Sequence, residues 1–185
     1  MTPQPTQAYP LDLHGWFRWQ EPFAQLLSKH RPTACVEVGS WMGCSAVFTA
    51  QRIKTWGGHL TCVDLWGPWY LEDHAVAERS ATAYERFCSN IHYLGLSETV
   101  TPLRMTSPEA ARGHGPVDWV YIDGSHDYPN VKADLDAWWP LLREGGLFLG
   151  DDFGMLGPRM AWTEWATTHG RSLSDIEGQL VWVVK

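Results

Sequence analysis

The hydrophobic positions of this 185-residue chain follow two spacings that alternate along its length. Short apolar runs indicate buried strands, and segments with apolar residues three and four positions apart indicate amphipathic helices. The predicted strands are 34–38, 59–64, 99–104, 117–123 and 147–152. The predicted helices are 21–30, 43–55, 74–94, 131–145 and 158–169. Strands separated by helices predict right-handed βαβ units and a mainly parallel sheet with helices on both faces.

The end of the chain has a different pattern. Residues 171–185, RSLSDIEGQLVWVVK, predict two antiparallel strands joined by a tight turn at Glu177–Gly178. The predicted fold is a single α/β domain over residues 1–185, doubly wound and Rossmann-like, with a seven-stranded sheet and a C-terminal antiparallel hairpin. Residues 1–10 are expected to be flexible, and residues 11–30 to form an N-terminal helical or lid segment.

Two residues mark boundaries within this pattern. Pro102 lies in the third predicted strand, and a proline cannot donate to a sheet ladder, so Pro102 indicates either an edge strand or the end of a strand. Asp73 is the predicted N-cap of the helix 74–94, which is expected to stop at Gly95.

Composition and charge narrow the class of protein. Apolar residues make up 44% and charged residues 19% of the chain, as in a soluble globular protein. The net charge of −7 gives no general attraction to nucleic acid. The first residues lack the apolar core of a signal peptide, and no apolar run approaches a membrane span. The four cysteines lack zinc-ligand or CxxC spacing. We expect a cytoplasmic protein without a nucleic-acid or membrane partner.

Three acidic residues follow two of the predicted strands. They are Asp123 in VYIDGSH and the pair Asp151 and Asp152 in LFLGDDF. Ligands of open α/β sheets bind outside the carboxyl ends of the strands. Carboxylates gathered there repel one another unless a cation or hydrogen-bond donors compensate. Because oxygen ligands with room for water suit Mg²⁺, the sequence predicts a divalent-metal site beside a cofactor pocket.

The turn after the first strand reads VEVGSWMGCS. Its glycines are Gly39 and Gly43, and Trp41 stands where a dinucleotide-binding GxGxxG turn has its middle glycine, which counts against NAD. Asp64 ends the second strand, where a carboxylate can accept hydrogen bonds from two ribose hydroxyls. The alternative is that Gly39 only makes a tight turn and Asp64 only caps a loop.

Four segments, VEVGSWMGCSA, VDLWG, YIDGSHDY and LGDDF, resemble the motifs of class I S-adenosylmethionine (SAM)-dependent methyltransferases. Within that class they are most similar to the metal-dependent catechol-type and macrocin-type O-methyltransferases. The resemblance extends from about Gly15 to the C-terminus. It implies Asp123, Asp151 and Asp152 as metal ligands. It also implies a set of cofactor-binding residues, namely Glu37, Gly39, Ser40 and Gly43 around the methionine part, Asp64 at the ribose, Leu65, Thr106 and Ser107 at the adenine, and Asp123.

His126 is the candidate base. It lies three residues after Asp123, where catechol-type enzymes carry a catalytic lysine, and an imidazole can accept a proton near neutral pH. With Asp123 it forms the candidate catalytic pair, although a turn residue bonded within its own loop is the competing interpretation. Trp16, Trp19, Trp66 and Trp69 are candidates for walls of the site or for packing against the helices of the domain.

The resemblance implies SAM- and Mg²⁺-dependent O-methylation of a small hydroxylated molecule, such as a sugar or a catechol-like acceptor. With little chain left for a separate substrate domain, a second subunit could complete the pocket, so a homo-oligomer is one expectation. Three alternatives remain open. They are a metal-independent SAM methyltransferase, a SAM-binding regulatory or assembly module that does not catalyse, and, on fold grounds alone, an NAD-dependent oxidoreductase.

Overall fold

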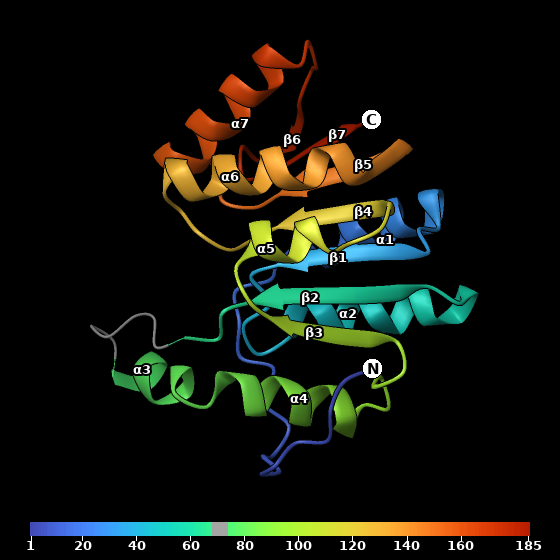
Figure 1. The fold of residues 1–185 in the computed structure, drawn as a ribbon, viewed down its shortest axis with the longest axis vertical. Helices are drawn as coiled ribbons and strands as arrows, with labels where there is room; N and C mark the ends of the chain where they lie inside the picture. The colour runs from blue at the N-terminus through green and yellow to red at the C-terminus, as the bar shows by residue number, and fades with distance from the viewer. Residues whose placement is uncertain (68–73) are drawn as a thin grey trace.

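The computed structural model describes residues 1–67 and 74–185, whose centre is a seven-stranded sheet in the order β3-β2-β1-β4-β5-β7-β6 (Figure 1). Strands β1 to β5 pair in parallel, and β7 is antiparallel to both β5 and β6. The predicted fold class is therefore confirmed, with β3 at an edge, one of the two positions that Pro102 indicated. The strands are β1 (Ala34–Val38), β2 (His59–Asp64), β3 (Val100–Arg104), β4 (Val117–Ile122), β5 (Leu142–Gly150), β6 (Ser174–Ile176) and β7 (Leu180–Val184).

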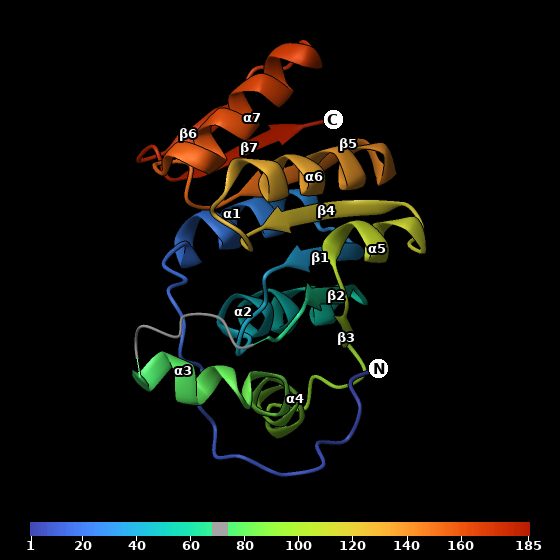
Figure 2. The same cartoon turned by 60° about the vertical axis from the view of Figure 1, so that its left-hand side comes forward.

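Helices cover both faces of the sheet (Figures 1 and 2). Buried residues of α1, α2 and α4 form one core cluster, and buried residues of α5, α6 and α7 form the other. The helices are α1 (Gln20–His30), α2 (Cys44–Ile53), α3 (His74–Ser80), α4 (Ala83–Tyr93), α5 (Ser107–Arg112), α6 (Tyr128–Trp138) and α7 (Leu156–Thr168), with short 3-10 helices η1 (Lys54–Trp56) and η2 (Trp139–Leu141). No helix in the described ranges is long and apolar enough to cross a membrane.

Strand β4 shows how the sheet divides its side chains between the two cores. Trp119 and Tyr121 belong to the cluster with α1 and α2, whereas Val120 and Ile122 belong to the cluster with α6 and α7. This is the period-two alternation of a strand. Asp123 is next in the series that contains Trp119 and Tyr121, so the alternation directs it toward the α1 and α2 side.

Two predicted helices differ from the observed ones. The predicted helix 74–94 is two helices, because Thr82 leaves helical geometry at φ −123° while the buried Ser80 hydroxyl bonds to the Gly67 carbonyl at 2.8 Å. The predicted helix that ended at Gly145 stops at Trp138. Pro140 lacks a backbone N–H and cannot continue the helix, so the chain passes through η2 and enters β5 at Leu142. The predicted cap Asp73 lies outside the described residues.

The N-terminal segment is tied to the rest of the chain. Thr2 is buried, its N–H donates to Ser97 at 2.9 Å and its hydroxyl donates to the Val100 carbonyl at 2.7 Å. These contacts contrast with the flexibility expected for residues 1–10. The chain then runs past α4 to the carboxyl ends of the strands and enters α1 at Gln20 (Figure 2). The lid-like segment therefore borders the edge where ligands of such sheets bind.

Candidate functional site

The carboxyl ends of β1, β4 and β5 are held side by side by hydrogen bonds just beyond the strands. The N–H of Asp123 donates to Val38 at 2.8 Å, and the N–H of Asp151 donates to Ile122 at 3.0 Å. On the other side of β1, the N–H of Gly39 donates to Val63 of β2 at 2.8 Å. The sheet ladder thus brings the glycine turn and the acidic residues predicted from the sequence to one edge.

Gly39 allows the turn after β1 to lie in close contact with the turn after β4. Its φ of +87° lies in the left-handed region, and a Cβ there would lie 2.1 Å from the carbonyl oxygen of Asp123. A side chain at this position would therefore push the β1 and β4 turns apart. Gly43, at φ +91°, is the N-cap of α2, as the sequence indicated.

Glu37 and Ser40 carry unpaired polar atoms inside the glycine turn. Both residues are buried, and Glu37 Oε1 and Ser40 Oγ have no hydrogen-bond partner. Burial raises the pKa of Glu37 to about 7, and the nearby hydroxyls of Ser40 and Ser45 oppose that rise. A buried polar atom without a partner is costly, so these two atoms suit a ligand that brings a donor such as an amino group.

Asp64 holds the glycine turn and the loop after β2 together. Its two carboxylate oxygens accept the N–H of Trp41 at 2.9 Å and of Trp66 at 2.8 Å. Burial raises the pKa of Asp64, and these backbone donors oppose the rise. The backbone N–H groups of Leu65 and Ser40 also act on this carboxylate. Asp64 therefore holds the loop after β2 against the glycine turn.

Trp66 and Trp16, two of the candidate wall residues, differ in burial. Trp66 is 2% exposed, packs against Tyr84 and Phe87, and donates its indole N–H to the Trp41 carbonyl at 2.6 Å. It is a core residue and not a wall of an open pocket. Trp16 is 65% exposed, with its ring centroid 6.3 Å from that of Trp41. Trp69 lies outside the described residues.

The residues expected at the adenine lie beyond β3. Thr106 is the N-cap of α5 and forms a capping box with Glu109. The Ser107 hydroxyl accepts the indole N–H of Trp138 at 2.9 Å. Leu65, directly after β2, is 41% exposed. These residues are thus available at the same edge of the sheet as Asp64.

The acidic residues form a hydrogen-bonded cluster with Tyr121, which the sequence analysis did not name, and with Trp19, which it named only as a candidate wall of the site. The Tyr121 hydroxyl lies 2.8 Å from Asp151 and 3.1 Å from Asp123. The indole N–H of Trp19 donates to Asp151 at 2.7 Å, and the N–H of Asp152 donates to its other oxygen at 2.8 Å. Burial and the neighbouring carboxylates hold the pKa of Asp123 well above its usual range.

Tyr121 and Trp19 differ in how far the sequence could have revealed them. Tyr121 precedes Asp123 by two residues in a strand, so the alternation rule places both on one side of the sheet. Trp19 is 132 residues away from Asp151, and no local pattern connects the two.

His126 is paired with Asp152. The two side chains lie 2.9 Å apart, between His126 Nε2 and a carboxylate oxygen, and each is about one-third exposed, at 37% and 31%. The hydrogen bond to Asp152 raises the pKa of His126. Asp152 adopts φ +55°, and this turn directs the chain back toward the histidine.

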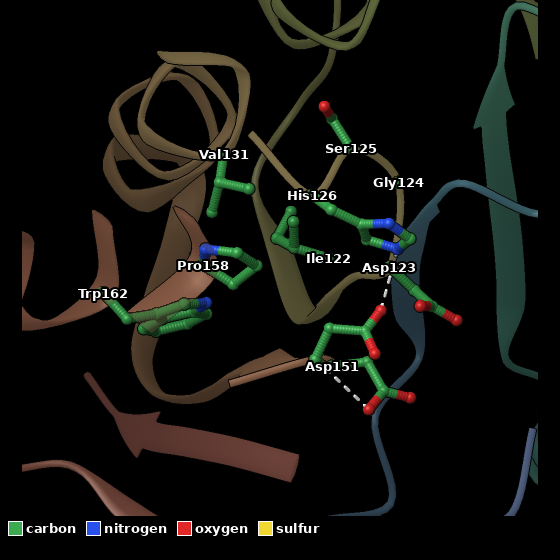
Figure 3. Close-up of a pocket in the computed structure, with 10 residues that line it drawn as sticks. Ile122, Asp123, Gly124, Ser125, His126, Val131, Asp151, Pro158 and Trp162 are labelled. Atoms are coloured by element: carbon green, nitrogen blue, oxygen red, sulfur yellow. Dashed lines mark hydrogen bonds and ion pairs between the residues drawn. The ribbon is translucent and has the colours of Figure 1, made fainter. Parts of the chain in front are cut away.

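The pair borders a pocket with an acidic and an apolar side. In Figure 3, Asp123, His126 and Asp151 lie on one side of the pocket, and Val131, Pro158 and Trp162 lie on the other. The first turn of α7 packs tightly on the histidine loop, since a Cβ on Gly157 would lie 2.2 Å from the His126 carbonyl oxygen. The start of α7 therefore limits where the His126 loop can lie.

The predicted metal ligands are brought to one edge but do not form a ready coordination site. Among residues 1–67 and 74–185, no group of three or more His, Cys, Asp or Glu side chains is arranged to hold a metal. Asp151 accepts bonds from Trp19, Tyr121 and the N–H of Asp152 on its two oxygens, and Asp152 pairs with His126. The donor atoms suit Mg²⁺, but their arrangement does not.

Comparisons with known proteins agree with this architecture. A family model described as a methyltransferase domain matches residues 36–153. This range contains the glycine turn and the three predicted metal ligands, Asp123, Asp151 and Asp152. The chain is also 27% identical over 150 residues to the uncharacterized protein y4gI of Sinorhizobium fredii (strain NBRC 101917 / NGR234). That match covers 80% of this chain and only 16% of the relative's length.

Solved structures share the fold. An O-methyltransferase from Bacillus cereus in complex with S-adenosylhomocysteine (SAH) superposes with a TM-score of 0.66 at 18% identity, covering 95% of this chain and 84% of that one. TomG from Streptomyces achromogenes, an O-methyltransferase involved in tomaymycin synthesis and solved with SAM, gives 0.64 at 16% identity, covering 94% and 82%. At these identities the likeness concerns the fold alone.

Proposed function

Because the chain belongs to the methyltransferase-domain family, we propose that it transfers a methyl group from SAM to a hydroxyl oxygen of a small acceptor molecule. The choice of a hydroxyl oxygen as the methyl acceptor rests on one observation. A histidine paired with a carboxylate, His126 with Asp152, lies at the same edge as the glycine turn that would hold the cofactor. Such a pair is suited to remove the proton that a hydroxyl must lose when it is methylated.

The cofactor would lie between the glycine turn and Asp64. SAM supplies an electrophilic methyl group on a sulfonium and leaves as SAH. The unpaired oxygens of Glu37 and Ser40 would accept the amino group of its methionine part, and Asp64 would accept the ribose hydroxyls. The adenine would lie against Leu65 and the turn at Thr106–Ser107.

His126 would act as the base through its second ring nitrogen. With Nε2–H donated to Asp152, the neutral ring has its lone pair on Nδ1. Nδ1 would take the proton from the acceptor hydroxyl while Asp152 stabilises the imidazolium that results. Since burial and nearby carboxylates favour the protonated form of Asp123, this side chain would donate a hydrogen bond that orients the acceptor.

The proposal is tested by SAH formation with a panel of catechols and sugar diols. General-base catalysis contributes about 10²–10⁴-fold, so His126→Asn should lower kcat by that factor while the Kd for SAH stays unchanged. His92→Asn, at an exposed histidine on α4, is the matched control and should behave as wild type. Wild-type turnover by His126→Asn would refute the role of the base.

A Mg²⁺ requirement is a more specific proposal that the sequence suggests. To bind the ion, Asp151 and Asp152 would have to turn away from Trp19 and His126, so no step above is assigned to a metal. The proposal predicts that EDTA removes activity and Mg²⁺ restores it. Full activity in EDTA would instead favour the metal-independent methyltransferase. SAH binding without turnover on any acceptor would favour a non-catalytic module.

A further inference from the structure

Asp151 uses both of its carboxylate oxygens for donors of the protein itself. Its Oδ2 accepts the indole N–H of Trp19 at 2.7 Å and the hydroxyl of Tyr121 at 2.8 Å. Its Oδ1 accepts the backbone N–H of Asp152 at 2.8 Å. Because a carboxylate oxygen has two lone-pair sites, Oδ2 has none left for a further ligand. A divalent cation at this oxygen would have to displace Trp19 or Tyr121.

The two donors differ in what they would lose if a cation displaced them. The Tyr121 hydroxyl also lies 3.1 Å from Asp123, so it can donate to that carboxylate instead. Within residues 1–67 and 74–185, Asp151 is the only hydrogen-bond acceptor of the Trp19 indole. Trp19 is 3% exposed, so water would not replace the lost partner. A cation that takes Oδ2 therefore leaves a buried N–H unpaired, which is unfavourable.

The start of α1 holds Trp19 in this position. Trp19 is the N-cap of α1, and its carbonyl accepts the N–H of Phe23 at 2.9 Å. The Phe23 ring is fully buried and packs edge-on against the Tyr121 ring, with 4.9 Å between the centroids. The first turn of α1 thus places two aromatic residues over the end of β4. Trp19 cannot leave Asp151 unless this packing is disturbed.

We propose that Trp19 sets the affinity of this edge of the sheet for divalent cations, because its indole N–H competes with the cation for Oδ2 of Asp151. The two occupants exclude each other at that oxygen. The free energy of the Trp19 contact is therefore subtracted from the binding of any cation there, and a bound cation in turn weakens the attachment of the N-terminal segment. This competition does not depend on methyl transfer, and a cation alone is enough to reveal it.

The test is the Kd for Mn²⁺, which prefers the same oxygen ligands as Mg²⁺ and whose free form is measured by electron paramagnetic resonance. Trp19→Phe keeps an aromatic ring and removes the N–H donor. It should lower the Kd at least about tenfold, the factor expected when a competing hydrogen bond to a charged group is removed. Adding Asp151→Asn to Trp19→Phe should abolish this gain, because the amide is neutral, and would place the cation at Asp151.

Trp56→Phe is the matched control. It also removes an indole donor, but that donor bonds to the Pro32 carbonyl at 2.8 Å, near the amino ends of the strands, so the Kd should not change.

A merely structural role of Trp19 predicts a different pattern, with a lower free energy of unfolding in urea and an unchanged Kd for Mn²⁺. A folded Trp19→Phe with the wild-type Kd overturns the proposal, and so does a gain that persists with Asp151→Asn or that appears equally in Trp56→Phe. If Trp19→Phe does not fold, Trp19→Met decides in the same way, because its flexible side chain fills space without an N–H donor.

Discussion

Replacing Glu37 with glutamine should stabilise the cofactor-free protein at pH 8. Glu37 is 1% exposed, and this burial, with a smaller contribution from the charge of Asp64, raises its pKa from 4.5 to about 7. At about 1.4 kcal/mol per pKa unit, that difference corresponds to about 3 kcal/mol. Glutamine keeps the shape of the side chain and removes the charge.

The sign follows from proton linkage. A carboxyl whose pKa is raised by folding contributes its stability in full below the unfolded value of 4.5, and loses it as the pH rises through about 7. Wild type should therefore lose about 3 kcal/mol from this group between pH 4.5 and pH 8, and Glu37→Gln should lose none of it.

Urea unfolding of both proteins at pH 5 and pH 8, without cofactor, measures the difference. Glu144→Gln, at an exposed position in β5, is the control for the loss of one charge. Glu37→Gln should also lose affinity for SAM, because a carboxylate is the stronger acceptor for a cationic amino group. A Glu37→Gln protein that is less stable than wild type at pH 8 would show that the protein already satisfies the carboxylate, and the reasoning would fail.

Three further outcomes are expected. Gly39→Ala should lower the free energy of unfolding, measured in urea, by about 2 kcal/mol or more. Gly39 has a φ of +87°, and a Cβ at this position would meet the Asp123 carbonyl oxygen. Asp64→Ala should weaken SAM binding by about 1–3 kcal/mol in calorimetry, and an unchanged Kd would remove it from the ribose site. Tyr121→Phe should shift the pH profile of kcat, because Asp123 and Asp151 lose a shared donor, and an identical profile would contradict that coupling.

The fold was accessible from the sequence because its signals are local. Apolar periodicity located every strand of the sheet, and Pro102 was consistent with the edge position of β3. The predicted helix boundaries were wrong where a single residue ends a helix although the apolar spacing continues. The apolar spacing through Trp139 and Leu142 continues as if the helix did, but Pro140 ends it.

The site was accessible in part, for a related reason. Gly39, Asp64, Asp123 and the pair at 151–152 follow strands, so the order of elements is enough to bring them to one edge. Their partners are set by tertiary packing. No spacing predicts that Trp19 donates to Asp151, or that Asp152 turns at φ +55° to pair with His126. The sequence therefore predicts which residues gather at this edge of the sheet, but not the hydrogen bonds that they form there.

The central claim is methyl transfer from SAM to an acceptor oxygen. The most direct test gives the purified protein SAM with an isotope-labelled methyl group and a panel of catechols and sugar diols, and identifies the labelled product by mass spectrometry and NMR. The account predicts a methyl ether formed by wild type and by His92→Asn, and strongly reduced with His126→Asn. A label found on nitrogen or carbon, or an equal yield of ether from His126→Asn, would contradict it.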